Sequence, residues 1–412
     1  MIKPNLHEFI VCRNILNDSV FKKLVAFLDD TQNITLRNNL IAELIEKAET
    51  LGLAGNLICS YTAYLMSQGN NIVALMTERS NGQIGTSLYN AFKTDMVTMY
   101  YLLNLVPSFF INSKVLDDYQ PTTLNKSIAF ANLQAKLNEL TSNDALADVF
   151  INYYRTYGYG DIANYRAFRW DNEKHLVGIK YFDKMSLEDL IGYERQKNLL
   201  ISNTEALVAG KPANNTLLVG ARGTGKSSAV KALANKYFDQ GLRLLEITKH
   251  QLIHLPKIME TLRLCSSKKF IIFLDDLSFE DFEVEYKYLK SAIEGGVEAK
   301  PANVLIYATS NRRHLIKETW KDRGEANDEI HRSDSMNETI SLSDRFGLTI
   351  SYLAPSQEEY LTIIAGLLKK HHIDLDSEGL RAQAIKWETH HSGRSGRTAQ
   401  QFVNHYLGTI QK

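Results

Sequence analysis

One eight-residue stretch of the sequence constrains the fold more than any other feature. It reads Gly220-Ala221-Arg222-Gly223-Thr224-Gly225-Lys226-Ser227 and matches the pattern G-x-x-x-x-G-K-[ST] at every position. An apolar run, Thr216–Val219, precedes it, and a helical run, Ser228–Tyr237, follows it. In this order, a strand, a glycine-rich turn and a helix form a loop whose backbone N–H groups converge on a phosphate. The sequence therefore predicts a P-loop, in which the backbone from Gly220 to Ser228 surrounds the phosphates.

Two side chains of this loop, and two that follow another strand, suit a nucleoside triphosphate with Mg²⁺. Lys226 is expected to reach the β- and γ-phosphates, and the Ser227 hydroxyl is expected to hold Mg²⁺. The apolar run Phe270–Leu274 ends directly in Asp275 and Asp276. Asp275 is predicted to order Mg²⁺, directly or through water, and Asp276 to orient the attacking water.

The distribution of β-rich and helical runs divides the 412 residues into three predicted parts. Residues 1–180 are expected to form a helical N-terminal domain, because apolar residues recur at helical spacing from Asn14 to about Tyr157. Residues 187–354 alternate strands with helices, which predicts a mostly parallel sheet covered on both faces. Residues 355–412 are expected to form a small helical lid from segments at about 356–370, 377–391 and 396–408.

Five short runs define the predicted sheet, and a polar insertion, Lys321 to Asn337, is expected to be a surface loop. The predicted strands are Thr216–Val219, Leu242–Ile247, Phe270–Leu274, Val304–Ala308 and Leu348–Tyr352.

Charge and cysteine content argue against several classes of protein. Lys+Arg and Asp+Glu both number 47, so the overall charge does not point to nucleic acid or an anionic membrane as partner. Cys12, Cys59 and Cys265 are scattered, which fits a reducing cytosol better than a disulfide framework. The most apolar stretch, Met96 to Ile111, is shorter than the ~20 residues of a spanning helix. We therefore expect a cytoplasmic protein without a membrane segment.

A segment rich in aromatic residues and arginine has two open interpretations. Its side chains could stack on the bases of single-stranded nucleic acid. They could instead form an aromatic seam that packs the helical domain onto the next domain of the chain, and the absence of net basic charge nearby favours this packing. The residues are Tyr153, Tyr154, Tyr157, Tyr159, Tyr165, Phe168 and Trp170, with Arg155, Arg166 and Arg169.

Five motifs taken in order resemble those of an AAA+ ATPase. The P-loop and the Asp275-Asp276 strand are followed by Tyr307–His314, Leu342–Gly347 and Gly393–Ala399. More closely, the chain is similar to the bacterial predicted-ATPase family catalogued as domain of unknown function 815. That resemblance is dense from about Leu187 to Phe402. It implies an α/β P-loop fold of the AAA+ type with ATP and Mg²⁺ as ligands.

The resemblance also implies roles for single residues around the nucleotide. Asn311 matches the sensor-1 position, which helps to hold the attacking water, although a turn-forming Asn explains it equally well. Arg345 matches the arginine finger that reaches the γ-phosphate of a neighbouring subunit; its plainer interpretation is an ion pair with Asp344 or a surface arginine. Arg397 matches the sensor-2 arginine at the start of a lid helix, with Arg394 as its alternative.

Two further features bear on the contact with adenine and on the rate of hydrolysis. Ile191, Gly192 and Tyr193 lie where such proteins pack on adenine, although a plain helix start also explains them. Asp276 stands where most active AAA+ proteins have Glu, and a misplacement of ~1 Å can cost on the order of 10²-fold. We therefore expect slow hydrolysis unless the site compensates, for example through Glu280 or Glu283.

Three functions are compatible with these motifs. The leading one is an ATPase whose subunits assemble around shared nucleotide sites and remodel an unknown protein or nucleic-acid target. The alternative is a nucleotide-gated interaction module with little turnover, which Asp276 favours. A small-molecule P-loop kinase ranks last, because it does not explain why Asn311, Arg345 and Arg397 occur together.

Overall fold

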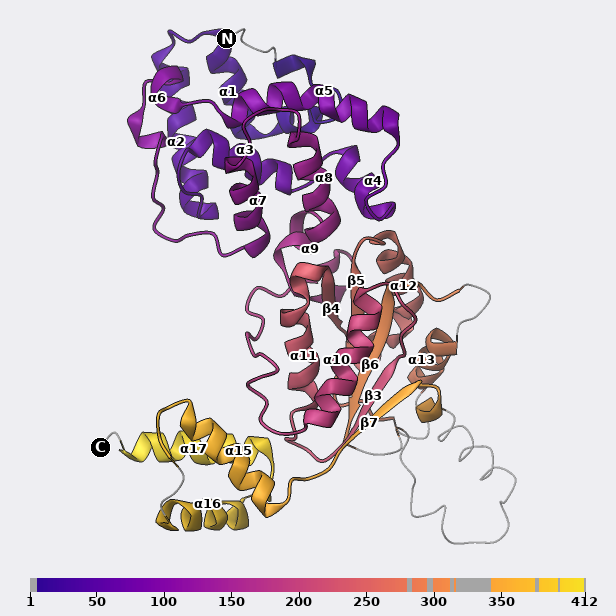
Figure 1. Cartoon of the computed structure of the whole chain (residues 1–412). Coiled ribbons are helices and arrows are strands. Elements are labelled where there is room, and N and C mark those ends of the chain that lie inside the picture. Colours follow the sequence, from indigo (N-terminus) through magenta and orange to yellow (C-terminus); the bar gives the residue numbers. More distant parts are fainter. Residues whose placement is uncertain are drawn as a thin grey trace. The chain divides into compact units, whose positions relative to one another are not determined.

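The computed structural model describes residues 6–279, 284–294, 299–311, 315, 342–374, 378–391 and 393–410, and Figure 1 shows the whole chain. Two compact units can be distinguished. Unit 1 comprises Met1–Tyr165, Asp239–Gly241 and Leu264–Lys268, and unit 2 comprises Arg166–Phe238, Leu242–Arg263 and Lys269–Lys412. The predicted surface loop Lys321–Asn337, together with Glu280 and Glu283, lies outside the described residues.

Unit 1 is built from helices, and short polar side chains fix the starts of the first four. Asp18 accepts hydrogen bonds from the backbone N–H groups of Val20 and Phe21, and Asn33, Asn56 and Asn71 cap the next helices in the same way. Such caps satisfy N–H groups that have no partner inside the helix. The helices are α1 (Ser19–Asp29), α2 (Ile34–Leu51), α3 (Leu57–Ser67), α4 (Ile72–Arg79), α5 (Thr86–Leu103), α6 (Pro107–Phe110), α7 (Ile128–Asn138), α8 (Leu146–Tyr157) and α9 (Gly160–Asn164), with three short 3-10 turns.

Unit 2 contains a seven-stranded sheet with the order β2-β1-β4-β5-β6-β3-β7. Neighbouring strands are parallel except β1 and β2, which are antiparallel, so the prediction of a mostly parallel sheet is confirmed. The strands are β1 (Ala167–Asp171), β2 (His175–Gly178), β3 (Thr216–Gly220), β4 (Leu242–Glu246), β5 (Lys269–Leu274), β6 (Val304–Ser310) and β7 (Leu348–Tyr352).

The first two strands correct the predicted boundary at residue 180. β1 and β2 extend the sheet of unit 2 beyond β4, and unit 2 begins at Arg166. β1 contains Phe168 and Trp170 of the aromatic segment, and both are buried in unit 2. Tyr153 and Tyr154 of the same segment are buried in unit 1. These four rings pack inside the protein, so their faces are not available for stacking on bases.

Helices cover the sheet and form a small C-terminal group in unit 2. Four helices accompany the strands: α10 (Glu194–Val208), α11 (Lys226–Lys236), α12 (Leu255–Leu264) and α13 (Glu285–Glu294). The last three, α15 (Gln357–Lys369), α16 (Glu378–His390) and α17 (Gly396–Ile410), enclose a core of their own that includes Tyr360, Leu380 and Phe402. Figure 1 shows these three helices following β7. No helix among the described residues is long and apolar enough to cross a membrane.

Asn214 and Asn215, which precede β3, form hydrogen bonds with neighbouring elements of unit 2. The Asn215 side-chain oxygen accepts the backbone N–H of Ile306 at 2.9 Å and the Lys300 ammonium at 2.6 Å. Asn203 of α10 donates to the Asn214 carbonyl at 2.8 Å. The pair therefore ties the start of β3 to β6 and α10, at the edge of the sheet where the parallel strands begin.

Candidate nucleotide-binding site

The predicted P-loop joins the end of β3 to the start of α11. Gly220 is the last residue of the strand, and Lys226 is the first residue of the helix. Gly220 has a φ of +133°, and a Cβ atom there would collide with the carbonyl oxygen of Tyr352 on β7. A residue without a side chain is therefore required where the loop leaves the sheet.

The Lys226 ammonium lies inside this loop. It donates hydrogen bonds to the carbonyl oxygens of Gly220 at 2.9 Å and Ala221 at 2.7 Å, and to the Asn311 side-chain oxygen at 3.2 Å. Burial lowers the pKa of Lys226, and the charges of Asp276 and Asp275 act in the opposite direction. The ammonium is therefore held by neutral oxygens, which a phosphate group would outcompete because it carries a full negative charge.

Ser227 and Asp275 meet across the space between α11 and β5. The Ser227 hydroxyl donates to Asp275 Oδ1 at 2.6 Å, and the Thr309 hydroxyl donates to the same oxygen at 2.6 Å. A hydroxyl and a carboxylate at hydrogen-bond distance are hard oxygen ligands of the kind that Mg²⁺ prefers. The pair therefore fits the predicted role in holding this ion.

Asp276 adopts a left-handed backbone conformation with a φ of +50°. Its N–H group donates to the Thr309 hydroxyl at 2.9 Å, and its carboxylate accepts from the Asn311 side-chain amide at 2.5 Å. Asn311 thus contacts both Asp276 and Lys226. The structure brings the predicted water-orienting carboxylate and the predicted sensor-1 residue together.

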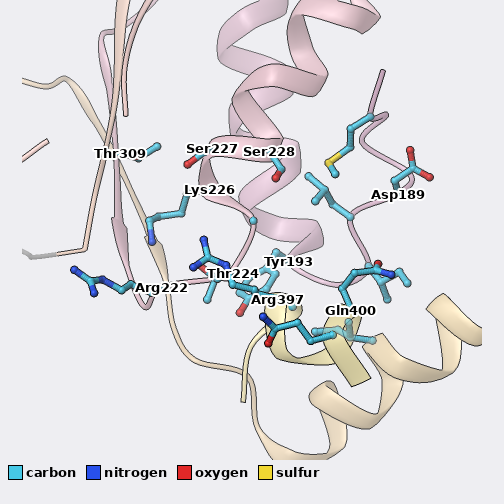
Figure 2. Close-up of a pocket in the computed structure, with 18 of the residues that line it drawn as sticks. Asp189, Tyr193, Arg222, Thr224, Lys226, Ser227, Ser228, Thr309, Arg397 and Gln400 are labelled. Carbon is cyan, nitrogen blue, oxygen red and sulfur yellow. The ribbon is translucent and has the colours of Figure 1, made fainter. Parts of the chain in front are cut away.

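These groups line one cavity with a volume of about 720 Å³. The part of the P-loop from Arg222 to Ser228 lines it, together with Asp275, Asp276 and Asn311. Figure 2 shows Arg397 and Gln400 extending into the pocket from α17, close to the loop that carries Thr224 and Lys226. The cavity is therefore enclosed by the sheet edge on one side and by the lid on the other.

The apolar end of the cavity lies between the segment before α10 and the lid. Ile191, Ile363 and Leu367 line it, and the Ile191 side chain packs directly on Gly366 of α15. Tyr193 also lines the cavity; its hydroxyl donates to the Leu353 carbonyl at 2.7 Å, and burial raises its pKa to about 12.

Gly192 contributes a turn to the same segment. Its φ of +83° and the φ of +58° at Tyr193 reverse the chain immediately before α10 begins. In the described structure Gly192 is not among the residues that line the cavity, whereas Ile191 is. Of the two residues, Ile191 lines the cavity and Gly192 reverses the chain.

The two candidate sensor-2 arginines have different surroundings. Arg397 lines the cavity, and its backbone N–H donates to the Gly223 carbonyl of the P-loop at 3.1 Å. Arg394 instead forms an ion pair with Glu388 of α16, with 3.3 Å between Nε and Oε2. The structure therefore favours Arg397 over Arg394 for a contact with nucleotide.

Arg345 lies outside the cavity of its own chain. It follows a helical turn at 342–344 and forms an ion pair with Glu294 at the end of α13, rather than the alternative pair with Asp344. It is not among the described residues that line the pocket.

Sequence reasoning missed Thr309, which contacts both carboxylate residues at the end of β5. The register of β5 and β6, in which Leu274 pairs with Ala308, places Thr309 beside Asp275. A strand register of this kind is not visible in the sequence of either strand alone. The one available signal in the sequence was that Thr309 is a polar residue near the end of the predicted strand, two positions before Asn311.

A family model described as protein of unknown function (DUF815) matches residues 163–410. Comparison of the sequence with curated proteins gives no match. The parallel sheet, the P-loop and the helical lid together form an α/β P-loop fold of the AAA+ type.

Solved structures of RuvB from Thermotoga maritima are among those similar to this chain. A single-residue mutant of RuvB shares 16% identity at a TM-score of 0.37, covering 56% of this chain and 68% of that chain. RuvB described as a Holliday junction branch migration motor shares 14% identity at a TM-score of 0.31, covering 54% and 72%. Such scores describe a distant likeness. The family match spans more than half of the sequence, and the chain belongs to the family described as protein of unknown function (DUF815).

Proposed function

We propose that this protein binds Mg-ATP in the cavity between the sheet and the lid, and that it hydrolyses ATP to ADP and phosphate. The observation that carries the proposal is the meeting of Lys226, Ser227 and Asp275 at one end of a cavity of about 720 Å³. A cation, a hydroxyl and a carboxylate beside a P-loop are the groups that a triphosphate and its metal ion require. The apolar surface around Ile191 and Ile363 suits a base at the other end.

Each group at the site has a separate role in hydrolysis. Backbone N–H groups of the P-loop bind the phosphates, and Lys226 exchanges its carbonyl contacts for the β- and γ-phosphates. Mg²⁺, held by Ser227 and Asp275, would neutralise phosphate charge when bound. Asp276 and Asn311 orient the attacking water. As the water oxygen bonds to the γ-phosphorus, Asp276 accepts its proton, the bond from that phosphorus to the β–γ bridging oxygen breaks, and ADP leaves.

Assembly and coupling form the second part of the proposal. Arg345 lies outside the cavity of its own chain, so a neighbouring copy would supply this arginine to each site. Arg397 connects the lid to the phosphates, because its backbone already contacts Gly223 and its side chain lines the cavity. Loss of the γ-phosphate would then move the lid, and the movement would act on a protein or nucleic-acid target.

A nucleotide-gated module with little turnover is the second candidate. The feature in its favour is Asp276, whose carboxylate is one methylene shorter than that of the glutamate usual in active AAA+ proteins. Single-turnover measurement separates the two functions. A gate would retain its ATP for hours, whereas an ATPase would convert it to ADP within minutes.

Titration calorimetry with ATP and Mg²⁺ tests the proposal directly. The parent protein is expected to bind, and Lys226→Ala is expected to lose most of the affinity because the phosphates lose their cation. Arg394→Ala is a matched control, since this arginine is paired with Glu388 in the lid. No heat with ATP, and no ATP-dependent rise in melting temperature for the parent, would remove the proposed function.

A further inference from the structure

The hydroxyl of Thr309 lies at the junction of the two carboxylate residues. Thr309 is the penultimate residue of β6, is 2% exposed and lines the cavity (Figure 2). The β5–β6 register fixes its position, because Leu274 pairs with Ala308 and the next residues on the two strands are Asp275 and Thr309. A polar side chain this deeply buried needs hydrogen-bond partners.

The hydroxyl oxygen of Thr309 forms hydrogen bonds with two consecutive residues. Its proton is donated to Asp275 Oδ1 at 2.6 Å, and its lone pair accepts the backbone N–H of Asp276 at 2.9 Å. Asp275 Oδ1 also accepts the Ser227 hydroxyl at 2.6 Å. The rotation of the Asp275 carboxylate is therefore set by two hydroxyl groups, one from the P-loop helix and one from β6.

The second hydrogen bond acts on backbone conformation. Asp276 has a φ of +50°, a region that residues with a side chain occupy at an energetic cost. Such a conformation persists only where the surroundings hold it. The bond from its N–H to Thr309 holds the backbone, and the bond from Asn311 holds the carboxylate.

We propose that Thr309 is a positioning residue that sets the Asp275 carboxylate for the metal ion and the left-handed backbone of Asp276 for the attacking water. This inference rests on the proposed binding of Mg-ATP. It assigns to β6 a second contribution to the site, separate from that of Asn311. It also identifies the hydrogen bond from the Asp276 N–H to Thr309 as the contact that would let Asp276 act at a position where glutamate is usual.

The test compares Thr309→Val with Thr309→Ser in the full chain. Valine keeps the branched shape but removes donor and acceptor, whereas serine keeps both. For each protein, the affinity for ATP is measured by calorimetry over a series of Mg²⁺ concentrations and in EDTA. Single-turnover hydrolysis and the melting temperature are measured alongside.

Thr309→Val is expected to raise the Mg²⁺ concentration needed for half-maximal tightening of ATP binding by about tenfold, and to slow single-turnover hydrolysis by about 10- to 100-fold, as loss of a hydrogen bond to a charged group predicts. Affinity in EDTA should be unchanged, because the P-loop contacts remain. Thr309→Ser should restore most of both quantities. A purely structural role would lower melting temperature and EDTA affinity together.

Two results overturn the inference in distinguishable ways. If the parent binds Mg-ATP and Thr309→Val has the same Mg²⁺ dependence and the same rate, the positioning role is wrong while the proposed function stands. If the parent does not bind ATP at all, the proposed function fails, and the inference fails with it. The Mg²⁺ series decides the question even for a protein that turns over too slowly to measure.

Discussion

Two variants that are inactive for different reasons should restore activity when they are mixed. Lys226→Ala removes the ammonium that lies among the loop carbonyls, but it leaves Arg345 in place. Arg345→Ala leaves the cavity complete, because this guanidinium is paired with Glu294 outside it. Loss of an arginine finger lowers turnover by about 10³-fold or more, so each variant alone is expected to be close to inactive.

The magnitude of the recovery follows from the geometry of a shared site. An active interface needs its cavity from an Arg345→Ala copy and its arginine from a Lys226→Ala copy. Random mixing at equal concentration gives this combination at about one quarter of the interfaces of a head-to-tail assembly, since two probabilities of one half are multiplied. Phosphate release at constant total protein should therefore reach about one quarter of the parent rate.

A matched control removes the arginine from both partners. The double variant Lys226→Ala/Arg345→Ala, mixed with Arg345→Ala, contains complete cavities but no finger, and it should remain inactive. The reasoning is refuted if the first mixture assembles like the parent, as judged by size-exclusion chromatography with light scattering, but stays as slow as either variant alone. Arg345 would then not act across the interface.

Three further predictions concern the lid arginine, the Asp189–Lys370 ion pair and the second carboxylate. Arg397→Ala should slow single-turnover hydrolysis about tenfold or more, whereas Arg394→Ala should stay near the parent rate; equal effects would contradict the sensor-2 assignment. The Lys370 ammonium and the Ser186 N–H group lower the pKa of Asp189 to about 2, so its contribution to stability is present above pH 3.8 and is lost as pH falls toward 2. Because both side chains of this pair are 43% exposed, Asp189→Asn should cost only about 0.5 kcal/mol in urea unfolding at pH 6, and less below pH 3.8; a difference that grows on acidification would contradict this. Asp276→Glu should lower the single-turnover rate about tenfold or more, and a faster variant would show that the aspartate is badly placed.

The central sheet was largely predictable, because parallel strands buried on both faces leave a continuous apolar signal. Phe270–Leu274 is buried at every position, and the predicted run matches β5 apart from its first residue. β1 was not predicted, because its residues alternate aromatic with charged side chains and a motif-based interpretation was available. β2, which is four residues long, was not predicted either. Phe168 is completely buried while Arg169 is exposed, so the alternation was that of a strand with one covered face.

The site was predictable to the extent that its residues are consecutive in sequence. The P-loop and Asp275-Asp276 carry their chemistry in short motifs, and the structure brings them together because both follow parallel strands and so lie at the same edge of the sheet. Contacts made by strand register or by distant helices were not predictable. Thr309 beside Asp275 depends on the pairing of β5 with β6, and the Arg345–Glu294 pair depends on where α13 ends.

The choice between an ATPase and a gate depends on whether backbone geometry compensates for the short side chain of Asp276. At a φ of +50° the Cβ atom leaves the chain in a direction that a right-handed residue does not use, and the carboxylate already lies 2.5 Å from the Asn311 amide. A glutamate on the same backbone would carry its carboxylate one methylene further and would have to give up this contact. The Asn311 hydrogen bond therefore argues that the aspartate is matched to the site rather than defective in it. Under the proposed function, this match predicts turnover of ATP and not binding alone.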